Sequence, residues 1–278
     1  MKVAAINDLS GFGKCSLTAD MTVLAAMGIQ CCPLSTAVLS AQTGYPSYYS
    51  RNLTGIIPEY QREWKNQSEV FDGIITGFMM SSAQAACSLE FIRTFKSEKT
   101  KVLVDPVMGD DGHTYKNFSN ELLETIREMV KEADIITPNL TELILLAGEN
   151  PDRIMQLKGD DLMDEIHRIS ILLGGEDGKI IAVTGIPLLK DDVIGNFIME
   201  NGEHKVITAQ SNGVHYSGTG DLFAAVFLGE CLRGGSAFDA ADLASRFILA
   251  SVRDTAGDTP PRAGVEYEKN LKILMNQT

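Results

Sequence analysis

Residues 217–221, Ser-Gly-Thr-Gly-Asp, lead directly into the apolar, alanine-rich segment 222–228. This pattern predicts a tight loop that opens a buried helix. The start of a helix presents unpaired N–H groups and the positive end of the helix dipole, and glycines allow an anion to come close to them. Asp221 would then face that anion. An ordinary glycine turn with Asp221 as the helix N-cap fits the same residues, so both interpretations stay open on this segment alone.

Two carboxylates, Asp105 and Asp110, share the loop Asp-Pro-Val-Met-Gly-Asp at residues 105–110, which follows an apolar run. Carboxylate oxygens are the usual protein ligands of Mg²⁺, which keeps several waters and also binds substrate phosphates. An aspartate that caps a turn at the end of a strand is the alternative, and it is common.

Asn139 and Glu142 stand three residues apart after Pro138, at the expected start of a helix. This spacing puts both side chains on one face of the first turn. A capping box, with Asn139 as N-cap and Glu142 at the third helical position, accounts for both residues. The functional alternative is that Glu142 holds a magnesium-bound water, and the two interpretations stay open together.

These groups together suggest phosphoryl transfer. Asp221 is the candidate base, because a hydroxyl that attacks a phosphoryl group needs a positioned acceptor for its proton. Backbone N–H groups of residues 218–221 would stabilise the charge on the transferred phosphate. The sequence contains no G-x-x-x-x-G-K-[ST] loop, no protein-kinase signature set, no H-E-x-x-H and no G-x-S-x-G elbow.

The elements that must position these groups alternate between apolar strands and helical patterns. Strands are expected at 2–6, 33–39, 72–77, 101–106, 135–139 and 179–185, and helices at 14–27, 50–68, 83–95, 121–131, 140–146, 161–173, 237–253 and from about 265. A hairpin with an Asn201-Gly202 turn is expected to join 193–198 to 204–208. Apolar strands separated by helices predict an α/β fold with a mostly parallel sheet covered on both faces.

Ligands bind beyond the carboxyl ends of the strands in such sheets. Polar residues are expected at these strand ends: Asp8, Thr43, Asp105, Asn139 and Thr184. Their shared placement is a stronger signal than any one of them.

Length and composition set the remaining limits. The 278 residues are 44% hydrophobic and carry a net charge of −13, and they contain no linker or repeat, so a single domain spanning 1–278 is expected. An acidic chain argues against nucleic acid or an anionic membrane as the main partner. The five cysteines form no CxxC pair, which predicts reduced thiols. The N-terminus becomes polar too early for a signal peptide, and no apolar run is long enough to span a membrane. We therefore expect a soluble cytoplasmic protein.

The motifs match a known family in order and spacing along nearly the whole chain. Residues 217–221 resemble the GTGD anion-hole motif of the ribokinase-like superfamily, 105–110 resemble the DPVMGD loop of its vitamin kinase branch, and 137–142 resemble its NxxE motif. Residues 42–45, Gln-Thr-Gly-Tyr, resemble the H-T-G-Y loop of pyridoxal/pyridoxamine kinases, whose Thr contacts the pyridine ring.

The resemblance implies a three-layer α/β/α sandwich and an ATP-dependent kinase that phosphorylates the 5′-hydroxymethyl group of B6 vitamers. It also implies Mg²⁺, a homodimer and often a potassium-type ion beside the anion hole. The implied roles are a base on the 5′-hydroxyl (Asp221), an anion hole (Gly218, Thr219, Gly220), contacts to Mg-ATP (Asp105, Asp110, Asn139, Glu142, with Asp105 and Glu142 nearest the metal, through water), a contact near the nucleotide (Thr184) and contacts to the vitamin ring (Asp8, Thr43, Phe78).

Some positions depart from the pyridoxal kinase pattern. Pyridoxal kinases typically have Ser where Asp8 stands, His where Gln42 stands and an aromatic residue, often Tyr, where Phe78 stands. Asp8 with Ser10-Gly11 resembles the SDPSG turn of hydroxymethylpyrimidine kinases, whereas those enzymes usually have Cys where Asp221 stands. Asp221 thus favours a pyridoxal kinase over two alternatives, a hydroxymethylpyrimidine kinase of thiamine synthesis and a vitamin- or nucleotide-binding sensor without catalysis.

Overall fold

The computed structural model describes residues 1–116, 118–190 and 192–275. Its main sheet has nine strands in the order β11-β10-β9-β8-β5-β4-β1-β2-β3. The strands are β1 (Lys2–Ser10), β2 (Gln30–Leu39), β3 (Ser50–Asn52), β4 (Gly73–Thr76), β5 (Lys101–Val104), β8 (Ile135–Ile136), β9 (Ile180–Pro187), β10 (Val193–Glu200) and β11 (Glu203–Gln210). The six neighbouring strands β9, β8, β5, β4, β1 and β2 are parallel. At the two edges, β3 pairs antiparallel with β2, β10 with β9 and β11 with β10.

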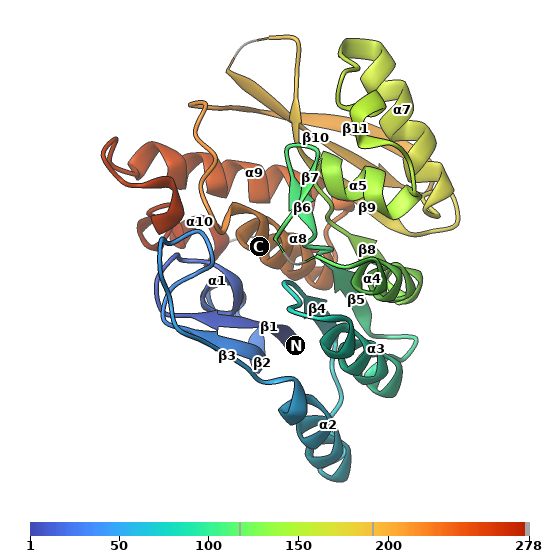
Figure 1. The fold of residues 1–278 in the computed structure, drawn as a ribbon, viewed down its shortest axis with the longest axis vertical. Coiled ribbons are helices and arrows are strands. Elements are labelled where there is room, and N and C mark those ends of the chain that lie inside the picture. The colour runs from blue at the N-terminus through green and yellow to red at the C-terminus, as the bar shows by residue number, and fades with distance from the viewer. Residues whose placement is uncertain (117, 191, 276–278) are drawn as a thin grey trace.

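Helices cover both faces of the sheet (Figure 1). The larger ones are α1 (Ser16–Ala26), α2 (Ile57–Asn66), α3 (Ser82–Phe95), α4 (Asn120–Glu132), α5 (Leu140–Ala147), α7 (Gly159–Leu172), α8 (Thr219–Arg233) and α9 (Ala237–Asp254). Along β1, Val3 and Ala5 pack with α1, α8 and α9, whereas Ala4 and Ile6 pack in the core with α3, α4, α5 and α7. This alternation confirms the expected three-layer α/β/α sandwich.

Two expectations at helix positions are wrong. The segment 50–68 begins with β3 and the short 3₁₀ turn η1 (Thr54–Ile56) before α2 starts at Ile57. All three residues of β3 are exposed, so no apolar alternation marked this edge strand. From about 265 the described chain forms only η3 (Glu268–Asn270) and α10 (Lys272–Met275) instead of a continuous helix, and the buried side chains of Val265 and Tyr267 anchor it to the core.

Short elements were also missed. The loop after β5 forms a small hairpin of β6 (Gly109–Asp110) and β7 (His113–Thr114), and the turns α6 (Pro151–Ile154) and η2 (Pro261–Ala263) add to the connections. Strands and helices of two to four residues carry too few side chains for a periodic pattern.

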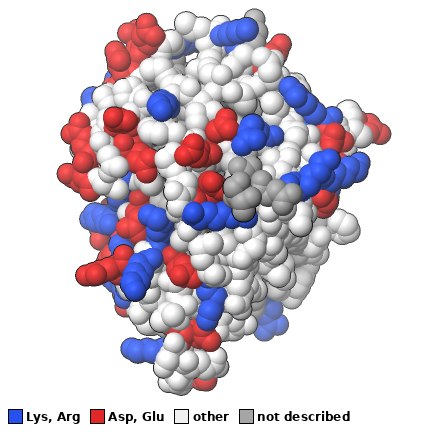
Figure 2. Space-filling model, turned by 180° about the vertical axis from the view of Figure 1, so that it is seen from behind, with Lys and Arg blue, Asp and Glu red and all other residues white. Residues whose placement is uncertain are grey.

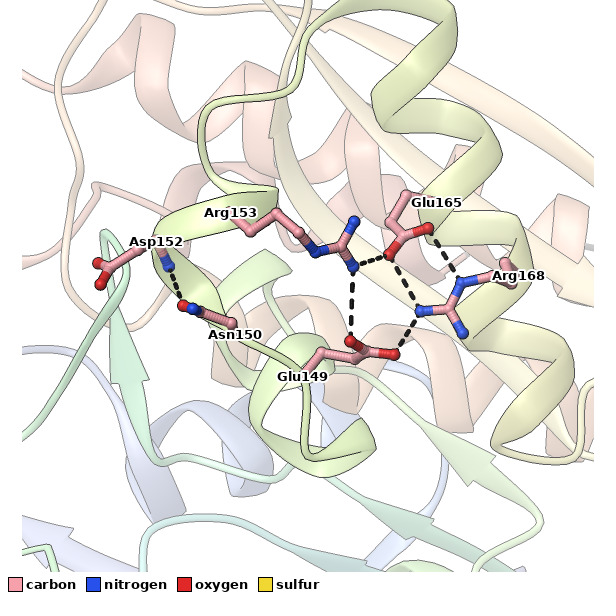
Figure 3. Close-up of polar contacts among 6 residues, drawn as sticks. All are labelled: Glu149, Asn150, Asp152, Arg153, Glu165 and Arg168. Atoms are coloured by element: carbon pink, nitrogen blue, oxygen red, sulfur yellow. Dashed lines mark hydrogen bonds and ion pairs between the residues drawn. The ribbon is translucent and has the colours of Figure 1, made fainter.

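Charged side chains of both signs are interspersed on the face drawn in Figure 2. One closed group of ion pairs joins the end of α5 to α6 and α7: Glu149 and Glu165 each bind both Arg153 and Arg168 (Figure 3). Among the described residues, no helix combines the length and the apolar character that crossing a membrane requires.

Candidate active site

One cavity of about 1010 Å³ opens at the carboxyl ends of the central strands. This cavity is lined by all of the site residues that the sequence predicted: Asp8, Thr43, Phe78, Asp105, Asp110, Asn139, Glu142, Thr184, Gly218, Thr219, Gly220 and Asp221. These residues come from segments that are far apart in the chain, so the fold brings the predicted set together.

The glycine loop before α8 has the form that an anion site needs. Gly218 is the N-cap of α8 with φ 82°, and Asp221 lies in the first turn. The N-cap role considered for Asp221 is therefore wrong. A Cβ atom at Gly218 would lie 2.5 Å from the carbonyl oxygen of Lys14, so only glycine fits this close approach. The first turn of α8 consequently starts inside the cavity, with its backbone N–H groups unpaired within the helix.

The carboxylate of Asp221 lies between the starts of two helices. It accepts a hydrogen bond from Nδ2 of Asn7 at 3.1 Å, and the backbone N–H groups of Ser16, which opens α1, and of Asp221 itself also favour its charged form. Burial outweighs these favourable interactions and the neighbouring charge of Asp8 adds to burial, so the pKa of Asp221 is raised to about 6. A carboxylate with this pKa is ionised at neutral pH and is still a useful proton acceptor.

Asn7 was not among the predicted site residues. Its Oδ1 accepts from the N–H groups of Asp8 (3.0 Å) and Phe78 (3.1 Å), while its Nδ2 donates to Asp221. A Cβ at Gly77 would lie 2.4 Å from the Asn7 amide, so the glycine after β4 makes room for it. The only signal in the sequence was a polar residue at the end of an apolar run.

Asp8 was expected to follow the first strand, but it lies within β1. The pairing of β1 with β2 shifts register between Asn7 and Leu9, and this irregularity places Asp8 at the cavity wall. The carboxylate accepts hydrogen bonds from Ser10 Oγ at 2.8 Å and Ser16 Oγ at 2.7 Å, and burial raises its pKa.

The loop after β2 is tied to the glycine loop before α8. Nε2 of Gln42 donates to Ser217 Oγ at 3.0 Å and to the carbonyl oxygen of Arg262 at 3.1 Å. Oε1 of Gln42 accepts from the N–H of Gly44 at 2.6 Å. The exposed Thr43 lies between these two bonded positions, at the rim of the cavity.

Asn139 and Glu142 form a full capping box at the start of α5. Oε2 of Glu142 accepts from Asn139 N–H at 2.9 Å, and Oε1 accepts from Met108 N–H at 3.0 Å. Asn139 also donates through Nδ2 to the carbonyl oxygen of Gly109 at 2.8 Å. The capping interpretation is thus correct, and the same bonds fix Glu142 against the 105–110 loop at the cavity wall.

Asp105 and Glu142 are both buried, and each lacks a Lys or Arg partner among the ion pairs of the described residues. Burial and the proximity of the two carboxyl groups raise the pKa of Asp105 well above its usual range, and burial raises the pKa of Glu142 to about 8. A cation would relieve this repulsion, so the two residues fit Mg²⁺. Mg²⁺ keeps several waters and also binds substrate phosphates, so it can be held with few protein carboxylates.

Thr184 lies inside β9, because the strand runs on to Pro187 past the expected end. The pairing of β9 with β10 is irregular between Gly195 and Phe197, opposite Thr184 and Gly185, and Gly185 has φ 67°. Asn196 Oδ1 accepts from Gly185 N–H at 3.1 Å and holds this bulge. Asp110 is exposed in the β6–β7 hairpin, where it also lines the cavity.

Comparison with known proteins places this arrangement in a family. Residues 12–261 match the phosphomethylpyrimidine kinase family. The chain belongs to this family. Pyridoxal kinase of Arabidopsis thaliana is 28% identical over 269 residues, which cover 92% of this chain and 82% of that protein.

Two solved structures are similar to this chain over nearly its whole length. A Bacteroides thetaiotaomicron protein described as a phosphomethylpyrimidine kinase, in a crystal form with pyridoxal, is 36% identical with a TM-score of 0.91, and the match covers 98% of this chain and 95% of that one. Pyridoxal kinase of Lactobacillus plantarum is 27% identical with a TM-score of 0.87, and the match covers 98% and 96% of the two chains. These matches confirm the resemblance to pyridoxal kinases of the ribokinase-like superfamily.

Proposed function

We propose that this protein is a pyridoxal kinase, which transfers the γ-phosphoryl group of ATP to the 5′-hydroxymethyl oxygen of pyridoxal, pyridoxamine or pyridoxine. The observation that carries the proposal is the position of Asp221. Its carboxylate lies in the first turn of α8 and lines the same cavity as Asp8, Thr43, Asp105 and Glu142. One base thus faces a region suited to a polar ring and a region suited to a metal-bound phosphate.

In the proposed reaction, the 5′-hydroxyl oxygen attacks the γ-phosphorus and the bond to the β-γ bridging oxygen breaks, releasing ADP. Asp221 accepts the hydroxyl proton. The N–H groups at the start of α8 stabilise charge on the transferred phosphoryl group. Gly218, Thr219 and Gly220 form this cradle, and Asp105, Asp110, Asn139, Glu142 and Thr184 bind the nucleotide side. Bound Mg²⁺, held near Asp105 and Glu142 through water, would neutralise phosphate charge.

Asp8, Thr43 and Phe78 contact the vitamin ring in this proposal. The half-buried ring of Phe78 offers a flat apolar surface, and Asp8 offers an acceptor whose orientation two serine hydroxyls fix. The B6 substrate is favoured over hydroxymethylpyrimidine by the pyridoxal kinase relatives and by the pyridoxal in the Bacteroides thetaiotaomicron crystal form.

A steady-state panel tests the proposal. ADP release is measured with the three B6 vitamers and with hydroxymethylpyrimidine at equal concentrations. We expect kcat/KM to be highest for a B6 vitamer. Faster turnover of the pyrimidine would instead support the thiamine-pathway kinase, and binding of ATP and pyridoxamine without ADP release would support a sensor.

Two further measurements address the assembly and the ions. We infer a cytoplasmic homodimer that requires Mg²⁺ and is stimulated by K⁺. Light scattering gives the oligomeric state, and replacement of K⁺ by a bulky organic cation gives its contribution to kcat.

A further inference from the structure

Asp20 is a buried acid directly behind the proposed active site. It lies on α1 and is 1% exposed. Its Oδ2 accepts a hydrogen bond from Asn7 Nδ2 at 3.2 Å, while Oδ1 is buried without a hydrogen-bond partner in the described part of the chain. An unpartnered buried oxygen costs free energy, so stability alone gives no reason for a carboxyl group here.

Asn7 connects Asp20 to Asp221. The two hydrogens of its Nδ2 serve Asp20 at 3.2 Å and Asp221 at 3.1 Å. Its Oδ1 is held by the N–H groups of Asp8 and Phe78. Since an amide has two donors and one acceptor oxygen, every polar group of Asn7 is in use and its orientation is fixed.

The titratable groups that interact electrostatically with Asp20 are acids and thiols. They are Asp221, Asp8, Asp105, Cys15 and Cys31. Burial and the charges of Asp221 and Asp8 raise the pKa of Asp20 well above its usual range. In its neutral form, Asp20 accepts from Asn7 without adding a second negative charge beside the base.

We propose that Asp20 is a positioning residue of the phosphoryl-transfer site, which acts on Asp221 through the side-chain amide of Asn7. Asp20 engages one amide hydrogen, so that the other stays directed at the base. The role rests on the proposed function, in which Asp221 takes the substrate proton.

Two substitutions separate positioning from structure. Asp20→Leu removes both the acceptor and the unpartnered buried oxygen but leaves one N–H of Asn7 unpaired, so we expect the two effects on Tm to offset each other. We expect kcat to fall ~10–100-fold, since a small misplacement of a catalytic group has an effect of this size, while KM for ATP changes less than about threefold. Asp20→Asn keeps an oxygen acceptor for Asn7 and should recover most of the lost kcat. Asp20→Val makes the same test if the leucine variant does not fold.

The pH profile gives an independent readout. Loss of the directed Asn7 hydrogen bond removes an interaction that favours charged Asp221, so the acid limb of kcat should move to higher pH in Asp20→Leu and stay in place in Asp20→Asn. Val23→Ala is the matched control, because this buried position on α1 carries no polar group to bond Asn7. It should lower Tm with kcat within about twofold of the wild type.

A double-mutant cycle decides whether the effect passes through Asn7. If it does, Asn7→Ala with Asp20→Leu should lower kcat no further than Asn7→Ala alone. Additive losses, or an Asp20→Leu enzyme with wild-type kcat and an unshifted pH profile, would overturn the positioning role. A wild-type protein that phosphorylates no B6 vitamer would instead overturn the proposed function.

Discussion

Nδ2 of Asn7 donates a hydrogen bond to Oδ1 of Asp221 at 3.1 Å, across 214 positions of the sequence. The bond joins β1 to the first turn of α8. Together with the N–H of Ser16, this bond brings polar groups from β1 and α1 to the carboxylate on α8. The proposed base is therefore oriented by main-chain and amide groups, and no lysine or arginine supports it among the bonds of the described residues.

The pKa of Asp221 predicts the pH dependence of turnover. The base must be ionised, so kcat should fall as the pH drops through about 6, instead of holding to about 4 as for an unperturbed aspartate. Asp8→Asn removes a neighbouring negative charge and should move this limb to lower pH. A kcat profile from about pH 4 to 8 at saturating substrates measures both, and a wild-type limb near 4 would contradict the assignment.

Gly218 and Gly220 should respond differently to alanine. Gly218 has φ 82° and no room beside Lys14, so Gly218→Ala should lower the free energy of unfolding by at least ~1–2 kcal/mol and abolish most activity. A methyl group added at Gly220 would have no neighbouring atom within 4 Å, so Gly220→Ala should leave stability unchanged or slightly raised.

The methyl group of Gly220→Ala would instead crowd the proposed phosphate site, which Gly220 lines. We expect this variant to show a lower kcat/KM with no loss of Tm. Urea unfolding and steady-state kinetics on the two glycine variants make the comparison. Full activity in Gly220→Ala would show that the phosphate does not approach this residue closely.

Gln42 should contribute to substrate affinity by holding the vitamin loop to the anion loop. Gln42→Ala removes the bonds to Ser217 and Arg262 and should raise KM for the vitamer about fivefold, as expected for loss of roughly 1 kcal/mol. Gln42→Glu keeps the acceptor for Gly44 N–H but removes the donor. If both variants keep wild-type KM, the link between the loops has no role in binding.

The ion-pair group around Glu165 should stabilise the packing of α6 and α7 against the end of α5. Arg168 and Arg153 lower the pKa of Glu165 to about 2, against 4.5 in the unfolded chain. The contribution is thus present above pH 4.5 and is lost as the pH falls toward 2. Both arginines are about half exposed, so solvent screening limits it to roughly 1 kcal/mol.

We expect Glu165→Gln to lower the free energy of unfolding by this amount at neutral pH, with kcat unchanged. The control is Glu124→Gln, which breaks a single pair with Arg127 in which Glu124 is 66% exposed, and which should have less than half the effect. Equal effects of the two substitutions would argue against cooperation within the group in Figure 3.

The sequence predicted the layers and most of the longer strands and helices well, because buried parallel strands and amphipathic helices leave clear apolar patterns. It failed where a position depends on pairing between distant strands. Asp8 was expected after its strand and Thr184 at the end of its strand, yet both lie within their strands, at irregularities in the pairing with β2 and β10. No local pattern encodes such a shift in register.

The candidate site shows the same division. Residues in short motifs, such as Asp221 and Glu142, could be found from type and spacing. Asn7 and Asp20 carry no motif, and their importance depends on an amide that reaches two acids at once. Only the packing of α1 against α8 beside β1 reveals them.

The most direct test of the central claim is transfer of the labelled γ-phosphoryl group of radioactive ATP to pyridoxal by the wild type and by Asp221→Asn. The wild type should form pyridoxal 5′-phosphate. The variant should keep its fold and its ATP affinity but lose ~10²–10⁴-fold in kcat, as expected for removal of a general base. A variant with near wild-type kcat, or a wild type that labels no B6 vitamer, would contradict the account.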